Sequence, residues 1–328
     1  MRIKIDADHG FVADNIKEII PDFLFLLKGG IDCPDVPLNV SRSFLQSDAY
    51  VSKLSSHIIR KVADKLNQLF KDQREQFEKY WSDIGVFVKY GMLREEKFND
   101  RIKDIVLFQT VDQTFKTLAE LDETILYTQD HRQQVAYVNM ARARNLTVIV
   151  MDHEIDNHFM SFIEFKNSGR KFKRVDAELG GKDSDSMHTD VLTDLFRKVS
   201  GQDKLTVKIQ SLGSDALPAM ILESEESRRM QEMRKQFERM GGSRDGMDFD
   251  AMFPLETTLV INDDQLLVSR LSALADLPQR QEQADLLARQ IYDLARLGHG
   301  SLTADDMASF LKRSTEVLEQ LTTPAEDQ

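Results

Sequence analysis

The sequence predicts a multidomain protein of mixed α/β and α+β class. At 328 residues the chain is long enough for two or three domains, each with its own hydrophobic core. Strand patterns alternate with helix patterns between residues 105 and 179, which is typical of a small sheet covered by helices. Helix patterns alone fill residues 264–321, so we expect the chain to end in a helical layer.

The first segment, residues 1–71, is expected to be part of an α/β layer. Strand-like residues are followed by a predicted helix over about 21–30, which Pro21 opens and a pair of glycines closes. Two prolines then predict a stiff loop, because proline fixes φ and disfavours helix at the residue before it. Apolar residues at helical spacing predict a long amphipathic helix over about 49–70.

The next two segments differ in their patterns. Residues 72–104 are charged and helical, which predicts a helical coil. Residues 105–182 are expected to form a small αβα domain, with strands near 105–108, 124–127 and 147–151.

The last segment, residues 183–328, follows the best linker candidate of the chain, the Gly/Ser/Asp-rich stretch 180–186. A mixed α/β domain that ends in helices is expected beyond it. Helices are predicted at about 187–199, 225–240, 264–275, 278–297 and 303–321, and strands at 205–210, 219–223 and 257–261.

Composition excludes several classes of function. The net charge of −12 disfavours a general nucleic-acid binder, whose affinity comes mainly from cations at phosphates, and also disfavours an anionic membrane surface. A single cysteine, Cys33, excludes an intrachain disulfide and fits a reducing compartment. Because we find neither a signal peptide nor a spanning apolar run, we expect a cytoplasmic protein with no membrane partner.

The proline-braced loop carries a resemblance to a known family. The run Asp35–Arg42, Asp-Val-Pro-Leu-Asn-Val-Ser-Arg, with Leu45-Gln46 behind it, resembles the catalytic loop of the heat-shock protein 90 family of chaperones, bacterial HtpG type. The resemblance covers about residues 11–321, and residues 3–10 depart from the family's strand. Further matching stretches are Phe11–Asn15, Ile19–Leu24, Trp81–Gly91, Ile155–His158 and the helices of 263–321.

This resemblance implies a role for three loop residues in ATP hydrolysis. Arg42 would reach the γ-phosphate of ATP, which a separate N-terminal domain holds with Mg²⁺. Gln46 would help to place the same phosphate, and Asn39 would support the loop or approach the nucleotide. Since the sequence lacks a P-loop, a GxGxxG motif and the family's nucleotide pocket, we expect no bound cofactor and no autonomous ATPase activity.

A stripe of methionines marks a second candidate site. Met230, Met233, Phe237 and Met240 share one face of the helix predicted over 225–240, and methionine suits surfaces that accept varied partners. The resemblance implies that this helix is exposed and binds unfolded or partly folded client proteins; a buried helix face is the alternative. The only tryptophan, Trp81, is either a core anchor or, by the resemblance, a client contact.

The last two helices carry apolar stripes. They could pack on their own domain. The resemblance implies that they pair across a twofold axis into a four-helix bundle and make a homodimer. The candidate interface residues are Leu287, Ile291, Leu294, Phe310, Leu311 and Leu318.

Two other functions stay open. A metal-dependent hydrolase on the small domain would use His153 and His158, but the HExxxH spacing leaves the two rings apart on a helix, so we expect no metal site. A dimeric scaffold without a client role is the other alternative. The basic run 169–174 is expected to be a solvated strand edge.

Taken with the four segments, the resemblance implies a fragment of a stress-response chaperone. Residues 1–71 would be the C-terminal part of the large middle domain with the catalytic loop, and 72–104 the helical coil. Residues 105–182 would be the small middle subdomain, and 183–328 the C-terminal domain for dimerisation and client contact.

Overall fold

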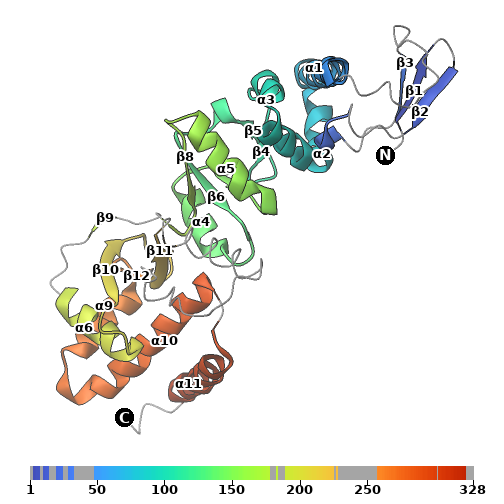
Figure 1. Ribbon diagram of the computed structural model, residues 1–328. Helices are drawn as coiled ribbons and strands as arrows, with labels where there is room; N and C mark the ends of the chain where they lie inside the picture. Colours follow the sequence, from blue (N-terminus) through green and yellow to red (C-terminus); the bar gives the residue numbers. More distant parts are fainter. Residues whose placement is uncertain are drawn as a thin grey trace. The chain divides into compact units, whose positions relative to one another are not determined.

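The fold was analysed in a computed structural model (Figure 1). It describes residues 3–7, 10–14, 20–24, 29–32, 48–177, 182–183, 189–224, 227, 257–300 and 302–322. The predicted mixed α/β class is confirmed by these helices and small sheets. The chain divides into two compact units, residues 1–124 with 151–171, and residues 125–150 with 172–328. The finer division into four segments stays a prediction.

A three-stranded sheet begins the first unit. β1 (Ile3–Ala7) lies between antiparallel β2 (Gly10–Asp14) and parallel β3 (Gly29–Asp32). Gly29 and Gly30, which were predicted to close the helix over 21–30, are paired with β1 in the strand β3, so they lie outside any helix. The helical turn described in this stretch is η1 (Asp22–Leu24).

Three helices follow and confirm the predicted long helix and helical coil. They are α1 (Asp48–Asp72), α2 (Arg74–Arg94) and α3 (Glu96–Ile102). Gly91 permits a close approach of η1 to α2, since a Cβ atom there would lie 2.5 Å from the ring of Phe23. The rings of Phe23 and Phe98 can therefore pack at a centroid distance of 4.8 Å.

A hairpin and a helix complete the first unit. The elements are β4 (Leu107–Gln109), its antiparallel partner β5 (Phe115–Thr117), η3 (Leu118–Glu120) and α5 (Glu154–Lys166). A buried ion pair joins α2 to α5, because Nζ of Lys89 lies 2.6 Å from Oδ1 of Asp156. The backbone N–H of His153 also donates to Asp156, so this carboxylate is satisfied on both oxygens.

The second unit contains two sheets. The first has the order β7-β6-β8 and is accompanied by α4 (Val135–Ala143); its strands are β6 (Thr124–Thr128), β7 (Val148–Val150) and β8 (Lys171–Arg174). The second has the order β11-β12-β10-β9, with β9 (Lys182–Asp183), β10 (Thr206–Ser211), β11 (Ala219–Glu223) and β12 (Thr257–Asn262). The linker prediction is wrong for Lys182 and Asp183, since they pair with β10.

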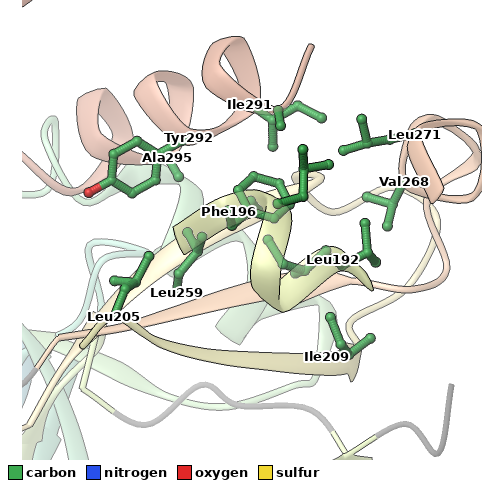
Figure 2. Close-up of a cluster of buried hydrophobic side chains, with 14 of the residues drawn as sticks. Leu192, Phe196, Leu205, Ile209, Leu259, Val268, Leu271, Ile291, Tyr292 and Ala295 are labelled. Atoms are coloured by element: carbon green, nitrogen blue, oxygen red, sulfur yellow. The ribbon is translucent and has the colours of Figure 1, made fainter. Parts of the chain in front are cut away.

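Helices cover this second sheet and enclose the main core of the unit. They are α6 (Thr189–Ser200), α9 (Leu266–Ala275) and α10 (Gln281–His299). η4 (Pro278–Arg280) precedes α10, and α11 (Ala304–Thr322) packs against α10. Figure 2 shows how Phe196 of α6, Leu259 of β12, Leu271 of α9 and Ile291 of α10 converge. None of the helices in the described part of the chain is long and apolar enough to cross a membrane.

Candidate functional site

The helix pair α10–α11 at the end of the chain is the candidate site that the structure describes most fully. Ala284, Ala288, Ile291 and Ala295 recur at helical spacing along α10, and all four are buried in the core of the second unit. Leu287 is half-buried against the same core. One face of α10 is therefore occupied by its own domain, and the other faces are left for α11 and for solvent.

A buried carboxylate attaches α11 to α10. The side chain of Asp293 is 1% exposed, and it lies 3.4 Å from Nε of Arg289 and 3.3 Å from Nη1 of Arg296. Arg313 of α11 donates to the same carboxylate and also to Oε1 of Gln290 at 3.1 Å. Because a buried charge is costly unless it is paired, this arrangement favours one position of α11 on α10.

A second set of polar contacts supports the same attachment. Nη2 of Arg296 lies 2.7 Å from Oδ2 of Asp306, and this hydrogen bond lowers the pKa of Asp306. Oγ1 of Thr303 accepts the backbone N–H of Asp306 at 3.2 Å, which caps the first turn of α11. Nε2 of Gln290 donates to Oγ of Ser314 at 2.8 Å.

With α11 held in this way, Leu311 and Leu318 face outward. Leu311 is 57% exposed and Leu318 is 62% exposed, and their spacing of seven residues places them on one side of the helix. Leu294 of α10 is 45% exposed, and Met307 and Phe310 are half-buried. We call Leu294, Leu311 and Leu318 the leucine surface.

The predicted interface residues therefore separate into two groups. Leu294, Leu311 and Leu318 are available to a partner, whereas Ile291 is 2% exposed and belongs to the core. Leu287 and Phe310 are intermediate. The periodicity could locate both stripes but could not tell which side of α10 its own domain covers.

The structure places Trp81 inside the first unit. Trp81 is 5% exposed, and its ring lies 5.6 Å from that of Phe77. A Cβ atom at Gly85 would lie 2.9 Å from Nε1 of Trp81, so the glycine makes room for the indole. These contacts are those of a core anchor, and a direct client contact stays a prediction.

Two predicted sites lie outside the described residues. These are the loop with Asn39, Arg42 and Gln46, and the helix with Met230, Met233, Phe237 and Met240.

His153 and His158, the two histidines of the hydrolase alternative, do not belong to one cluster of possible metal ligands in the described part of the chain. His153 lies beside Asp152 and Asp156, with ligand atoms within 4.8 Å of one another, whereas His158 is exposed. Asp156 is already paired with Lys89 at 2.6 Å. An ammonium group beside this carboxylate opposes a second cation, so the arrangement does not favour the hydrolase.

A buried polar cluster in the second unit was missed by the sequence analysis. Arg174 makes a two-pronged pair with Asp176 at 2.6 and 2.9 Å and also reaches Glu223 at 3.2 Å. His299, at the end of α10, lies 3.8 Å from both carboxylates. Gln134 donates to Asp176 at 3.1 Å. Apart from Arg174 and Asp176, these residues are far apart in the sequence, so no local motif signals the cluster.

Comparison with known proteins shows which family this sequence matches. The family model described as "Hsp90 protein" matches residues 1–328. The chaperone protein HtpG of Porphyromonas gingivalis (strain W83) is 36% identical over 296 residues, which are 82% of this chain and 42% of that protein. HtpG of Bacteroides fragilis (strain 638R) is 35% identical over 298 residues, which are 83% of this chain and 43% of that protein.

A more distant relative matches along more of the chain. HtpG of Sulfurimonas denitrificans is 25% identical over 338 aligned positions, which cover 96% of this chain and 51% of that protein. The chain thus spans about half, or less, of the length of these curated relatives.

Proposed function

Because the chain belongs to the Hsp90 protein family, we propose that it is the dimerising and client-binding portion of an ATP-dependent chaperone. The observation that carries the proposal is the leucine surface on α10 and α11. Three leucines that are 45–62% exposed are costly in water, and a second copy of the same surface would bury them.

The polar attachment of α11 supports the homodimer. An interface needs a defined shape before it can be self-complementary, and the arginines around Asp293 give α11 a defined position. Leu294, Leu311 and Leu318 would form the apolar centre of the interface. Leu287, Ile291 and Phe310 would support it from the side of the domain core.

The client-binding part of the proposal depends on the methionine stripe. Met230, Met233, Phe237 and Met240 would contact unfolded or partly folded proteins through flexible, polarizable side chains. Trp81 would stiffen α2 beneath a client surface, since its indole is buried.

The loop residues would act on a nucleotide held elsewhere. Arg42 would offset the charge that develops on the γ-phosphate, with Gln46 and Asn39 in supporting roles and ATP and Mg²⁺ bound by another domain. Fusion of this chain behind the preceding portion of the Bacteroides fragilis relative allows a test. ATP turnover of the fusion should fall about tenfold or more in Arg42→Ala; unchanged turnover would remove Arg42 from the proposal.

The chaperone role is tested by suppression of aggregation of a heat-denatured enzyme. The parent chain should suppress light scattering, and Met233→Ser with Phe237→Ser should lose most of this effect. Each lost apolar contact is worth about 1.5–3 kcal/mol, so client affinity should fall at least about tenfold.

The matched control is Leu266→Ser with Leu267→Ser, which removes apolar side chains that are 63% and 38% exposed on α9. This control should suppress aggregation as the parent does. Equal loss in both variants would indicate nonspecific stickiness, and no loss in either would remove the methionine stripe from the proposal. No suppression by the parent chain would favour the dimeric scaffold without a client role.

A further inference from the structure

A hollow between α1 and α3 combines a large volume with an unusual charge. Its volume is about 710 Å³, which lies within the range of small-molecule sites. Among the described residues that line it, Lys53, Arg60, Lys97 and Arg101 carry permanent positive charges, and Asp100 is the one acid. We call it the α1–α3 groove.

Helical spacing explains why the four cations face one another. Lys53 and Arg60 are seven residues apart on α1, and Lys97 and Arg101 are four apart on α3, so each pair projects from one side of its helix. Ile59, the neighbour of Arg60 in the sequence, is 4% exposed and also lines the groove.

The charge of the groove is opposite to that of the chain. The whole chain carries a net charge of −12, yet four cations gather here around one carboxylate. Arg101 lies 3.6 Å from Asp64 in an exposed ion pair, and such pairs are weak. Like charges at close range repel one another, so an anion between the helices would be stabilising.

We propose that the α1–α3 groove binds a phosphoanion with at least two linked phosphate groups. Arginine offers forked donors that match phosphate oxygens, and lysine adds point charges from both helices. The hydroxyl groups of Ser52 and Ser56 line the same groove and can donate further hydrogen bonds.

The lining also defines which part of a ligand is recognised. Ile59 is the apolar side chain among the described lining residues, which include no phenylalanine, tyrosine or tryptophan. The aromatic ring among them is the imidazole of His57, and its Nδ1 lies 2.9 Å from Nη2 of Arg60, so this ring is engaged with an arginine of the groove. The phosphate chain alone is therefore the recognised group, whether it comes from an inorganic polyphosphate or from the tail of a nucleotide.

Isothermal titration of the full 328-residue chain with sodium tripolyphosphate tests this proposal. A chelator removes metal ions that would bind tripolyphosphate. A salt concentration of about 50 mM keeps the screening of the charges low. The groove variant is Lys53→Gln with Lys97→Gln. The matched control is Lys61→Gln with Lys65→Gln, which removes two exposed lysines of α1 outside the groove and changes the net charge equally.

We expect saturable binding to the parent chain, a dissociation constant at least about tenfold higher in the groove variant, and a change below about twofold in the control. ATP, titrated under the same conditions, should bind within about threefold of tripolyphosphate. Equal weakening in both lysine variants, or binding of ATP without binding of tripolyphosphate, would overturn the proposal. Tighter binding of hexaglutamate would overturn it too, in favour of an acidic peptide.

Discussion

His299 shows how burial and charge compete at a single residue. Burial lowers the pKa of His299, while Asp176 and Glu223, each 3.8 Å away, raise it, and Arg174 lowers it further. The net direction is downward because desolvation is the largest cause. Nδ1 of His299 has no hydrogen-bond partner among the described residues, so the neutral ring is held by packing more than by bonding.

A pH dependence of stability follows from this direction. The unfolded chain takes up a proton near the ordinary pKa of 6.5, whereas the folded chain resists it until a lower pH. The free energy of unfolding should therefore fall as the pH falls below about 6.5, and His299→Gln should remove this part of the loss. Urea unfolding at several pH values between about 7.5 and 5 measures the difference between parent and variant.

The opposite result would contradict this direction. If the free energy of unfolding of the parent rises relative to that of His299→Gln as the pH falls, the ring is protonated in the folded state, and the two carboxylates outweigh burial in setting its pKa.

The same cluster shows what single residues reveal in a sequence. The basic run 169–174 predicts a solvated strand edge, and this is confirmed for Lys171, which is exposed. It is wrong for Arg174, whose side chain is 16% exposed and paired with Asp176 and Glu223. Glu223 is 49 residues away in the sequence, so only the fold could reveal this pairing.

At the scale of elements, the attachment of α11 to α10 decides which surface remains exposed. Asp306, Arg313 and Ser314 of α11 each contact a residue of α10. Leu311 and Leu318 remain exposed on α11. An α11 that is loosely held would present no defined leucine surface.

Removal of the central arginine tests this attachment. In Arg313→Gln the carboxylate of Asp293 loses a donor whose side chain is 13% exposed, and a hydrogen bond to a charged group is worth about 1.5–3 kcal/mol. Amide hydrogens of α11 should then exchange at least about tenfold faster. Hydrogen exchange followed by mass spectrometry measures this rate peptide by peptide.

The neighbouring Lys312 offers the control, since its side chain is 82% exposed and its contact with Glu316 is 4.0 Å long. Lys312→Gln should leave exchange in α11 unchanged. Equally faster amide exchange in both variants would mean that the loss of a positive charge, and not the loss of the bond to Asp293, destabilises α11.

Helices with a long apolar periodicity were predicted well. Short strands, whose formation depends on pairing with a distant strand, were predicted poorly. The apolar pattern over residues 49–70 predicts α1 to within about two residues at each end. The glycines at 29–30 and the stretch 180–186 carry turn signals, yet Gly29, Gly30, Lys182 and Asp183 pair in sheets. Sheet pairing joins residues from distant parts of the chain, so a local pattern cannot reveal it.

At the scale of the whole molecule, family membership could be inferred from the sequence because motifs along the chain agree with one another. The match of the family model to residues 1–328 confirms that inference. The candidate interface was only partly predictable, since the stripe of α10 contains both core residues such as Ile291 and exposed ones such as Leu294. Only the fold shows which residues of α10 are buried by its own domain and which remain exposed.

The central claim is that the leucine surface joins two copies of this chain, and sedimentation equilibrium at low micromolar concentration tests it most directly. A twofold axis would use each substituted leucine twice, so Leu311→Glu with Leu318→Glu should abolish association. The control, Leu266→Glu with Leu267→Glu on α9, should not. The account predicts twice the 37.7 kDa chain mass for the parent and the control and the single mass for the leucine-surface variant. A monomeric parent chain, or a dimer that survives both glutamates on α11, would contradict it.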